Sequence, residues 1–169
     1  MLSAFAAWMI AASPPPQSPA CTCLCTIPRL ESNVSLKVGE STTTVIFSRR
    51  VRDHTHIVVD KAGRYDIRAV GHWHDSIIRT DADGYLVSKA PVIGWPYLWV
   101  GSFMRRKQHQ RYFALIGEID SANGTFKIGK ELKNWTPKSS GELMTFANDV
   151  RFKYANNRGC LALTVTRTA

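Results

Sequence analysis

The sequence predicts an all-β domain, either a sandwich or a barrel, and three observations carry this prediction. Short runs of β-branched and aromatic residues recur along the chain, and some of them alternate apolar with polar residues as half-buried strands do. Turn signals rich in Gly, Asn and Asp separate these runs. No segment combines a sustained helical period with capping residues. The 169 residues, 44% of them hydrophobic, suffice for one domain with its own core.

The expected strands are the runs that combine β-forming residues with flanking turn signals. They cover residues 42–47, 55–59, 65–70, 113–119, 125–128, 141–147 and 160–166. Between two of them, Asn123-Gly124 is a strong hairpin signal. In the last run, Leu161, Leu163 and Val165 are expected on one face of the strand. Residues 81–84 (Asp-Ala-Asp-Gly) are expected to form a turn.

The N-terminal segment has a different character from the rest of the chain. Residues 1–12 are apolar, a Pro-rich stretch follows, and the apolar part is too short to span a bilayer. It is similar to the apolar core of a signal peptide but lacks a basic start. The segment is either a signal peptide that is removed or an extra stretch from an overlong gene start. The protein is accordingly either secreted or cytoplasmic. We expect residues 1–33 to be a disordered leader and residues 34–169 to form the domain.

The chain is basic, with a formal charge of +9 and a pI of about 9.7. This charge favours anionic partners, but no element is typical of a basic recognition helix, so nucleic acid is not expected. The densest basic run is residues 105–111 (Arg-Arg-Lys-Gln-His-Gln-Arg). This run is either a solvated loop or a patch for acidic glycans or lipid headgroups.

Several kinds of chemistry are not indicated by the sequence. Three cysteines alternate at Cys21, Cys23 and Cys25, which is poor zinc geometry, and Cys160 opens an apolar run as a small hydrophobe would. The chain contains no nucleophile elbow, no phosphate-binding glycine loop and no compelling carboxylate pair. We therefore expect a binding protein and not an enzyme.

The stretch richest in potential ligands is residues 148–159, which joins the last two expected strands. Calcium prefers six to eight oxygen ligands from carboxylates, amides, carbonyls and water. Asp149, Asn156 and Asn157 offer one carboxylate and two amides on a curled loop. The alternative is an ordinary turn, because Asn and Gly tolerate positive φ.

This stretch and the blocks before it resemble the calcium-dependent galactophilic lectins of bacteria. The resemblance extends over roughly residues 40–167 and is clearest over the last sixty or so. Its ordered blocks are residues 69–73, 115–119, 126–129, 141–143, 148–150 and 156–159. The resemblance implies a jelly-roll-like β-sandwich, often tetrameric, in which calcium bridges the protein and galactose hydroxyls.

The resemblance also implies a set of site residues. Calcium would be held by the side chains of Asp149, Asn156 and Asn157, by the backbone carbonyl of Lys153, and by a carbonyl of Asp75 or Ser76. The sugar would contact Asp149, Val150 and Asn156, with His72 and His74 as nearby candidates. Arg151, Lys153 and Arg158 depart from the family's smaller or uncharged residues and place cations beside a cation site.

The sequence therefore predicts a carbohydrate-binding module that recognises galactose or a related sugar with the help of calcium, and that could form a homo-oligomer. The alternative is a noncatalytic accessory or interaction domain that has lost calcium and contacts anionic glycans or lipid surfaces through its basic loops.

Overall fold

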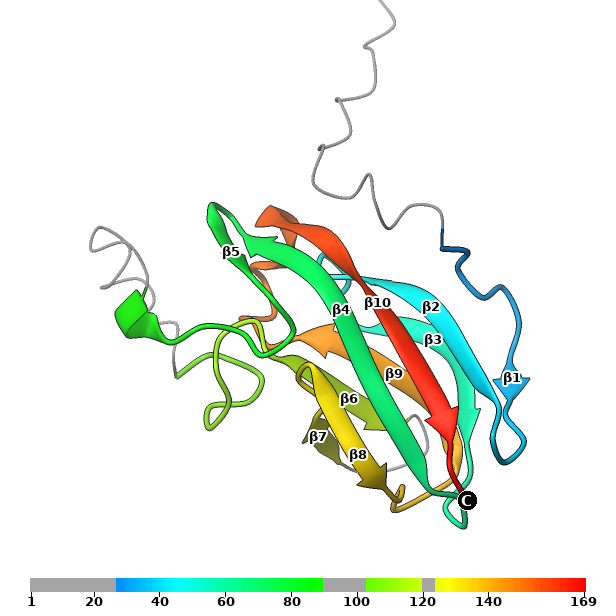
Figure 1. Cartoon of the computed structure of the whole chain (residues 1–169). Coiled ribbons are helices and arrows are strands. Elements are labelled where there is room, and N and C mark those ends of the chain that lie inside the picture. Colours follow the sequence, from blue (N-terminus) through cyan, green and yellow to red (C-terminus); the bar gives the residue numbers. More distant parts are fainter. Residues whose placement is uncertain (1–26, 90–102, 120–123) are drawn as a thin grey trace, which may run out of the picture.

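The structure, a computed structural model, describes residues 27–89, 103–119 and 124–169. Two β-sheets face each other, which confirms the predicted all-β sandwich (Figure 1). The first sheet has the strand order β1 (Val34–Ser35), β3 (Asp53–Val59), β9 (Gly141–Ala147), β6 (Leu115–Ile119) and β7 (Thr125–Lys127). The second has the order β2 (Ser41–Phe47), β10 (Asn157–Arg167), β4 (Tyr65–Asp75) and β5 (Ile78–Thr80), and β8 (Glu131–Trp135) pairs with β4. Short 3-10 turns are η2 (Val87–Lys89) and η4 (Tyr154–Asn156).

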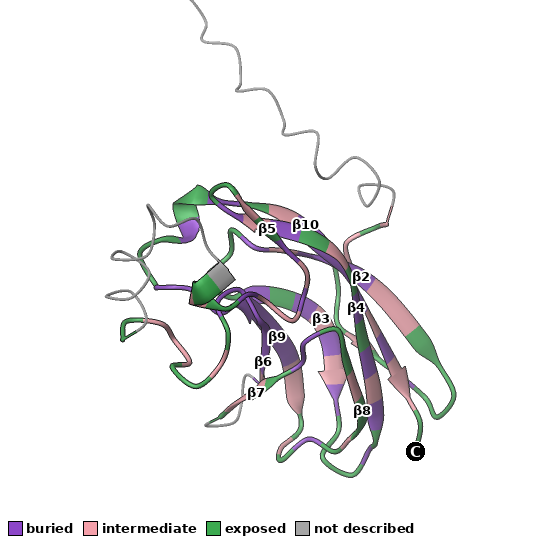
Figure 2. Ribbon diagram, turned by 60° about the vertical axis from the view of Figure 1, so that its left-hand side comes forward, coloured by how far each residue is buried: buried purple, intermediate pink, exposed green. Residues whose placement is uncertain are grey.

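The core lies between the two sheets, because alternate side chains of each strand point inward. In β4, Ile67, Ala69 and Trp73 are buried while the residues between them are more exposed (Figure 2). In β10, Leu161, Leu163 and Val165 are buried, as their alternation predicts. The Trp73 ring meets the Phe113 ring edge-on at 5.9 Å, so aromatic packing fixes the end of the core where β4 finishes.

The strands differ from the predicted runs at the edge of the second sheet. β5 and β8 were not expected: β5 has three residues, and β8 is mostly polar and places only Leu132 and Trp135 against the core. Both are held by pairing with β4, which continues to Asp75. Their pairing with β4, and not their own β propensity, makes these segments strands. The predicted turn at residues 81–84 is confirmed, with the Gly84 N–H donating to the Asp81 carbonyl at 3.1 Å.

The pairing of β4 with β10 positions the site. The two strands run antiparallel over their full length, and Asp75, the last residue of β4, lies opposite Asn157, the first residue of β10. The segment between β9 and β10 therefore lies at the same end of the sandwich as the β4–β5 hairpin (Figure 1). Residues far apart in the sequence meet there.

The contacts of the sandwich begin before the predicted boundary at residue 34. Arg29 forms an ion pair with Asp53 at 2.6 Å, and Leu30 packs against the core. The expected disorder of the leader falls largely on residues 1–26, which lie outside the described residues, as does Asn123 of the predicted hairpin. β6 and β7 are nonetheless paired as that hairpin requires. Within the described ranges, no helix is long and apolar enough to cross a membrane.

Candidate functional site

Asn148 anchors the loop that carries the predicted ligands. Its side chain is buried and accepts a hydrogen bond from the Lys107 N–H at 2.9 Å. Its amide nitrogen donates to the carbonyls of Lys107 and Arg111, both at 2.9 Å. The backbone of Asn148 also pairs with Phe113 and Ala114. One amide thus ties the basic loop of residues 105–111 to the start of the site loop.

Tyr154 closes the far side of the same loop. It begins the 3-10 turn η4, is 3% exposed, and donates its hydroxyl to the Ala147 carbonyl at 2.5 Å. The Lys153 N–H donates to the Val150 carbonyl at 2.8 Å. Two hydrogen bonds within the loop therefore restrain it, and they hold its residues close to the start of β10.

Asp149 and Asn157 form the buried half of the site. They are 3% and 1% exposed, and the Asn157 amide nitrogen donates to Oδ2 of Asp149 at 3.1 Å and to the Ser48 carbonyl at 3.2 Å. The Val150 N–H donates to Oδ1 of Asp149 at 2.6 Å. Two acceptors fix the orientation of the Asn157 amide, and its Oδ1 is buried with no hydrogen-bond partner among the described residues. A buried acceptor without a donor is costly unless something fills that position.

Asp75 contributes a second carboxylate to the site. Its side chain is 8% exposed, and its Oδ2 accepts a hydrogen bond from the Tyr85 hydroxyl at 2.5 Å. Its Oδ1 accepts from the exposed Asn156 amide at 3.2 Å. The sequence prediction used at most the Asp75 backbone carbonyl, but the structure turns the carboxylate itself toward the loop. It lies opposite Asn157 because β4 and β10 pair to their ends.

Tyr85 reaches Asp75 because the chain turns sharply before it. Gly84 has a φ of +71°, and a Cβ at this position would lie 2.1 Å from the Tyr112 carbonyl oxygen. The Tyr85 N–H donates to that same carbonyl at 2.8 Å. Only a glycine allows this approach, which sets the Tyr85 ring 5.6 Å from the Tyr112 ring, nearly parallel to it.

The two carboxylates give the site a negative electrostatic potential when they are ionised. Burial raises the pKa of Asp149 to about 6, and the nearby charge of Asp75 adds to this shift. Burial also raises the pKa of Asp75, against the hydrogen bonds from Tyr85 and Asn156, which lower it. The positive charge of Lys153 lowers the pKa of both carboxyl groups, so its ammonium acts on the same site. Repulsion between buried carboxylates is relieved by a bound cation.

The donor set suits a hard cation. It consists of two carboxylates, two amides and nearby backbone carbonyls, all of them oxygen ligands of the kind that calcium prefers. In the described part of the chain, no three His, Cys, Asp or Glu side chains gather as a metal site, so amide and carbonyl oxygens would have to complete the ligands of a bound ion. The unpaired Oδ1 of Asn157 is the atom that a calcium ion at this place would satisfy. The residues therefore fit the ion that the sequence predicts.

The carbonyl ligands implied by the resemblance lie in the two turns beside the carboxylates. Ser76 is exposed, with a φ of +53°, in the tight β4–β5 turn directly after Asp75. The Lys153 carbonyl accepts the Asn156 N–H at 3.2 Å within the 3-10 turn, which leaves its second lone pair for another partner. Val150 is 5% exposed and its backbone bridges to Arg105, so it offers little surface to a sugar.

His72 and His74 are not brought together with Asp149. They alternate with the buried Trp73 and Asp75 along β4, so their side chains lie on the outer face of the sheet. His72 pairs with Arg79 at 3.1 Å. Burial lowers the pKa of His74, and the positive charge of Arg79 adds to this effect. The strand period of two thus separates the histidines from the carboxylate site.

The basic run is partly structural. Arg106 is 9% exposed in its side chain, lies over the Phe146 ring at 3.3 Å, and forms an ion pair with Glu118 at 3.5 Å. Arg105 lies over the Tyr112 ring at 4.3 Å and donates to the Gln110 carbonyl at 2.6 Å. These two arginines hold the loop that supports Asp149, since the Arg106 N–H donates to the Asp149 carbonyl at 3.3 Å. Neither of these two arginines is freely solvated, because each guanidinium group lies over an aromatic ring.

Sequence reasoning missed Asn148, Tyr85 and the Asp75 carboxylate as parts of the site. Asn148 directly precedes Asp149, so its place in the loop was a signal that the ligand search did not use. Tyr85 carried no such signal. Its role depends on the Gly84 turn and on the stack with Tyr112, which joins segments distant in the sequence.

Comparison with known proteins supports the fold. A search of solved structures finds the EclA N-terminal domain, described as a PllA-like lectin, with a TM-score of 0.55 and 17% sequence identity. The match covers 74% of this chain and 94% of that chain. No family model matches the chain, and no curated protein does either. The chain therefore shares its β-sandwich fold with a lectin domain.

Proposed function

We propose that this protein is a noncatalytic carbohydrate-binding module in which calcium bridges the protein and the hydroxyls of galactose or a related sugar. The ion would be held by the side chains of Asp149, Asn157, Asn156 and Asp75, with carbonyl oxygens from Lys153 and Ser76. The observation that carries this proposal is the buried pair of Asp149 and Asn157, with the amide oxygen Oδ1 of Asn157 left unpaired. The lectin-type neighbour of the same fold supports it.

The chemistry of recognition follows from the donors. The four side chains and two carbonyls proposed above would supply about six oxygens, and calcium accepts up to about eight, so neighbouring hydroxyls of a sugar would complete its shell. Second lone pairs on the carboxylate oxygens of Asp75 and Asp149 would accept hydrogen bonds from the same hydroxyls. The exposed Asn156 amide stands at the rim of the site, where a ligand arrives from solvent. Galactose, with adjacent hydroxyls at C3 and C4, is the sugar that the resemblance implies.

The test is a calorimetric titration of methyl β-galactoside into the protein, once with millimolar calcium and once with excess EDTA. We expect heat of binding in calcium and none in EDTA. Methyl α-mannoside serves as the matched neutral sugar with a different arrangement of hydroxyls. Equal binding with and without calcium, or no binding of any neutral sugar, would overturn the proposal.

A second candidate function is favoured by Lys153. Its ammonium group lowers the pKa of both Asp75 and Asp149, so a positive charge of the chain itself partly neutralises the negative charge of the site. This arrangement suits an accessory domain that works without calcium and binds anionic surfaces through its basic residues. It predicts no heat with calcium and salt-sensitive binding to vesicles containing phosphatidylserine. Calcium-dependent sugar binding that is insensitive to salt would exclude it.

A further inference from the structure

A hollow of about 530 Å³ lies beside the carboxylate site. Its lining includes His72, Arg79, Asp81, Tyr85 and Arg111. Tyr85 connects the two places, because it lines the hollow and its hydroxyl donates to Asp75. Tyr85 is thus the residue that the hollow and the carboxylate site share.

The hollow carries uncompensated positive charge. Arg79 and Arg111 are exposed, and no acidic side chain among the described residues forms an ion pair with either. The one carboxylate in the lining, Asp81, is already paired with Lys130 at 2.8 Å. Two guanidinium groups thus line a hollow without an anion of their own.

His72 holds one of these guanidinium groups in position. Arg79 donates from one of its terminal nitrogens to Nδ1 of His72 at 3.1 Å. Arginine can only donate, so Nδ1 of His72 is the acceptor and carries no proton in this arrangement. The remaining N–H groups of Arg79 stay available, and a guanidinium presents them in the fork that matches a carboxylate or a sulfate.

Tyr85 gives the hollow a fixed wall. Its ring stacks on Tyr112, and the Arg105 guanidinium lies over the Tyr112 ring at 4.3 Å. The short turn at Gly84 and the bond to Asp75 restrain Tyr85 further. A rigid aromatic wall between a cation site and two arginines is an arrangement that orients a sugar ring with an acidic substituent.

We infer that the ligand of this protein is an acidic glycan, whose carboxylate or sulfate group is bound in the hollow by Arg79 and Arg111. The inference rests on the proposed function for the place of the sugar ring at Asp75 and Asp149. It adds the chemical class of the sugar, which a neutral galactose-binding site does not require. The excess of basic over acidic residues, 22 against 13, favours the approach of such a ligand.

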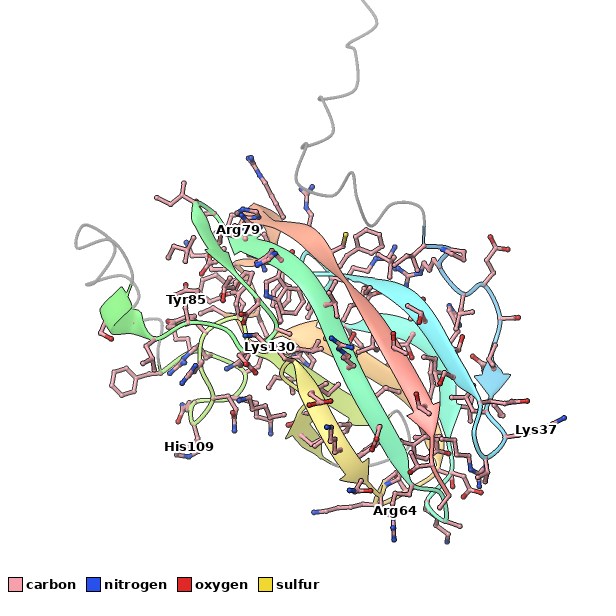
Figure 3. All side chains as sticks on the ribbon, in the orientation of Figure 1. Lys37, Arg64, Arg79, Tyr85, His109 and Lys130 are labelled. Carbon is pink, nitrogen blue, oxygen red and sulfur yellow. The ribbon has the colours of Figure 1, made fainter. Side chains whose placement is uncertain are left out.

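The first experiment tests the hollow without calcium or sugar. Inorganic sulfate is titrated into the full chain while the Nε–H signals of arginine and the ring signals of His72 are followed by NMR. We expect saturable shifts in the wild type that disappear in the double variant Arg79→Gln/Arg111→Gln. The double variant Lys37→Gln/Arg64→Gln removes the same charge at positions distant from Arg79 and should behave as the wild type (Figure 3). Equal shifts in all three proteins would mean nonspecific binding and overturn the inference.

The second experiment tests the class of glycan in calcium. Methyl galacturonoside and methyl galactoside 6-sulfate are compared with methyl galactoside, which has the same C3 and C4 hydroxyls but no charge. We expect one of the two acidic sugars to bind about five- to tenfold more tightly at low salt, which is the range for two solvent-accessible charge pairs. The acidic sugar that gains affinity distinguishes a carboxylate from a sulfate. High salt should reduce the gain.

The outcomes separate this inference from the proposed function. Calcium-dependent binding of all three sugars with equal affinity would leave the proposed function standing and overturn the acidic glycan. A gain for an acidic sugar that the Arg79→Gln/Arg111→Gln variant loses and the Lys37→Gln/Arg64→Gln variant keeps supports it. Saturable sulfate binding with no sugar binding at all would end the proposed function and, with it, the glycan that the inference names.

Discussion

The amide nitrogen of Asn157 lies 3.1 Å from Oδ2 of Asp149, a buried contact at one end of the sandwich between residues eight positions apart in the sequence. This contact holds the carboxylate against the start of β10, opposite the end of β4 where Asp75 lies. Both carboxylates are therefore tied to the β4–β10 strand pair, Asp75 as the last residue of β4 and Asp149 through its hydrogen bond from Asn157. The site is preformed to the extent that its two buried members already touch.

The stability of the calcium-free protein should depend on pH through Asp149. Its pKa rises from 3.8 to about 6 in the folded chain, so the folded state holds this proton more tightly than the unfolded state. The resulting stabilisation is complete below pH about 4 and is lost as the pH rises through about 6. We expect the free energy of unfolding to fall by about 3 kcal/mol over this interval because of Asp149.

Urea unfolding in EDTA across this pH range measures the effect, with Asp149→Asn as the comparison. The variant keeps an acceptor for Asn157 but has no proton to lose, so its curve should be flatter than that of the wild type. Titrating groups distant from the site affect both proteins alike, and the loss of the Asp149 charge also removes its effect on Asp75. Parallel curves for the two proteins would contradict the burial of a titrating Asp149.

Lys153→Gln should strengthen calcium binding several-fold. The proposed ligand is the Lys153 backbone carbonyl, which the substitution retains, whereas the side chain contributes a positive charge that acts on Asp75 and Asp149. Removing that charge lowers the cost of placing a second cation there. Calcium titrations of both proteins measure the change, and Lys37→Gln controls for net charge. A loss of affinity in Lys153→Gln would show that the side chain supports the site.

Arg106→Ala should destabilise the fold by about 2 kcal/mol, although it belongs to a run of basic residues that looks solvated in the sequence. Its guanidinium is largely buried over Phe146, is paired with Glu118, and donates to the Val51 carbonyl. Arg64→Ala is the matched control, because Arg64 is exposed, and should change stability by less than about 0.5 kcal/mol. Urea unfolding measures the free energy of unfolding of both variants. Equal values for the two would contradict the burial of Arg106.

The sequence predicts those strands, core positions and turns that depend on residues close together in the chain. Alternation in β4 and β10 places Ile67 and Leu163 in the core, and the turn at residues 81–84 follows from the Asp and Gly residues that it contains. β5 and β8 could not be found this way, because three residues and a mostly polar run carry too little periodicity. They become strands through their partner β4.

The site residues likewise divide into those that the sequence identifies and those that only the fold brings in. Asp149, Asn156 and Asn157 are neighbours on one loop, so composition and order alone single them out. The Asp75 carboxylate could not be assigned, because its direction depends on which face of β4 is inward at the last residue of the strand. His72 and His74 are close to Asp75 in sequence, but the period of two places them on the other face.

Calcium binding by the carboxylate pair is the central claim, and a calorimetric titration of calcium into the wild type, Asp149→Asn and Asp75→Asn measures it most directly. Each variant removes one negative charge from the cage, and calcium affinity follows the number of charged ligands. We expect saturable binding to the wild type and at least a tenfold loss in each variant. Asp66→Asn, at a carboxylate that accepts the Asn134 N–H away from the site, should bind as the wild type does. No heat of binding in the wild type, or equal affinity in all four proteins, would contradict the account.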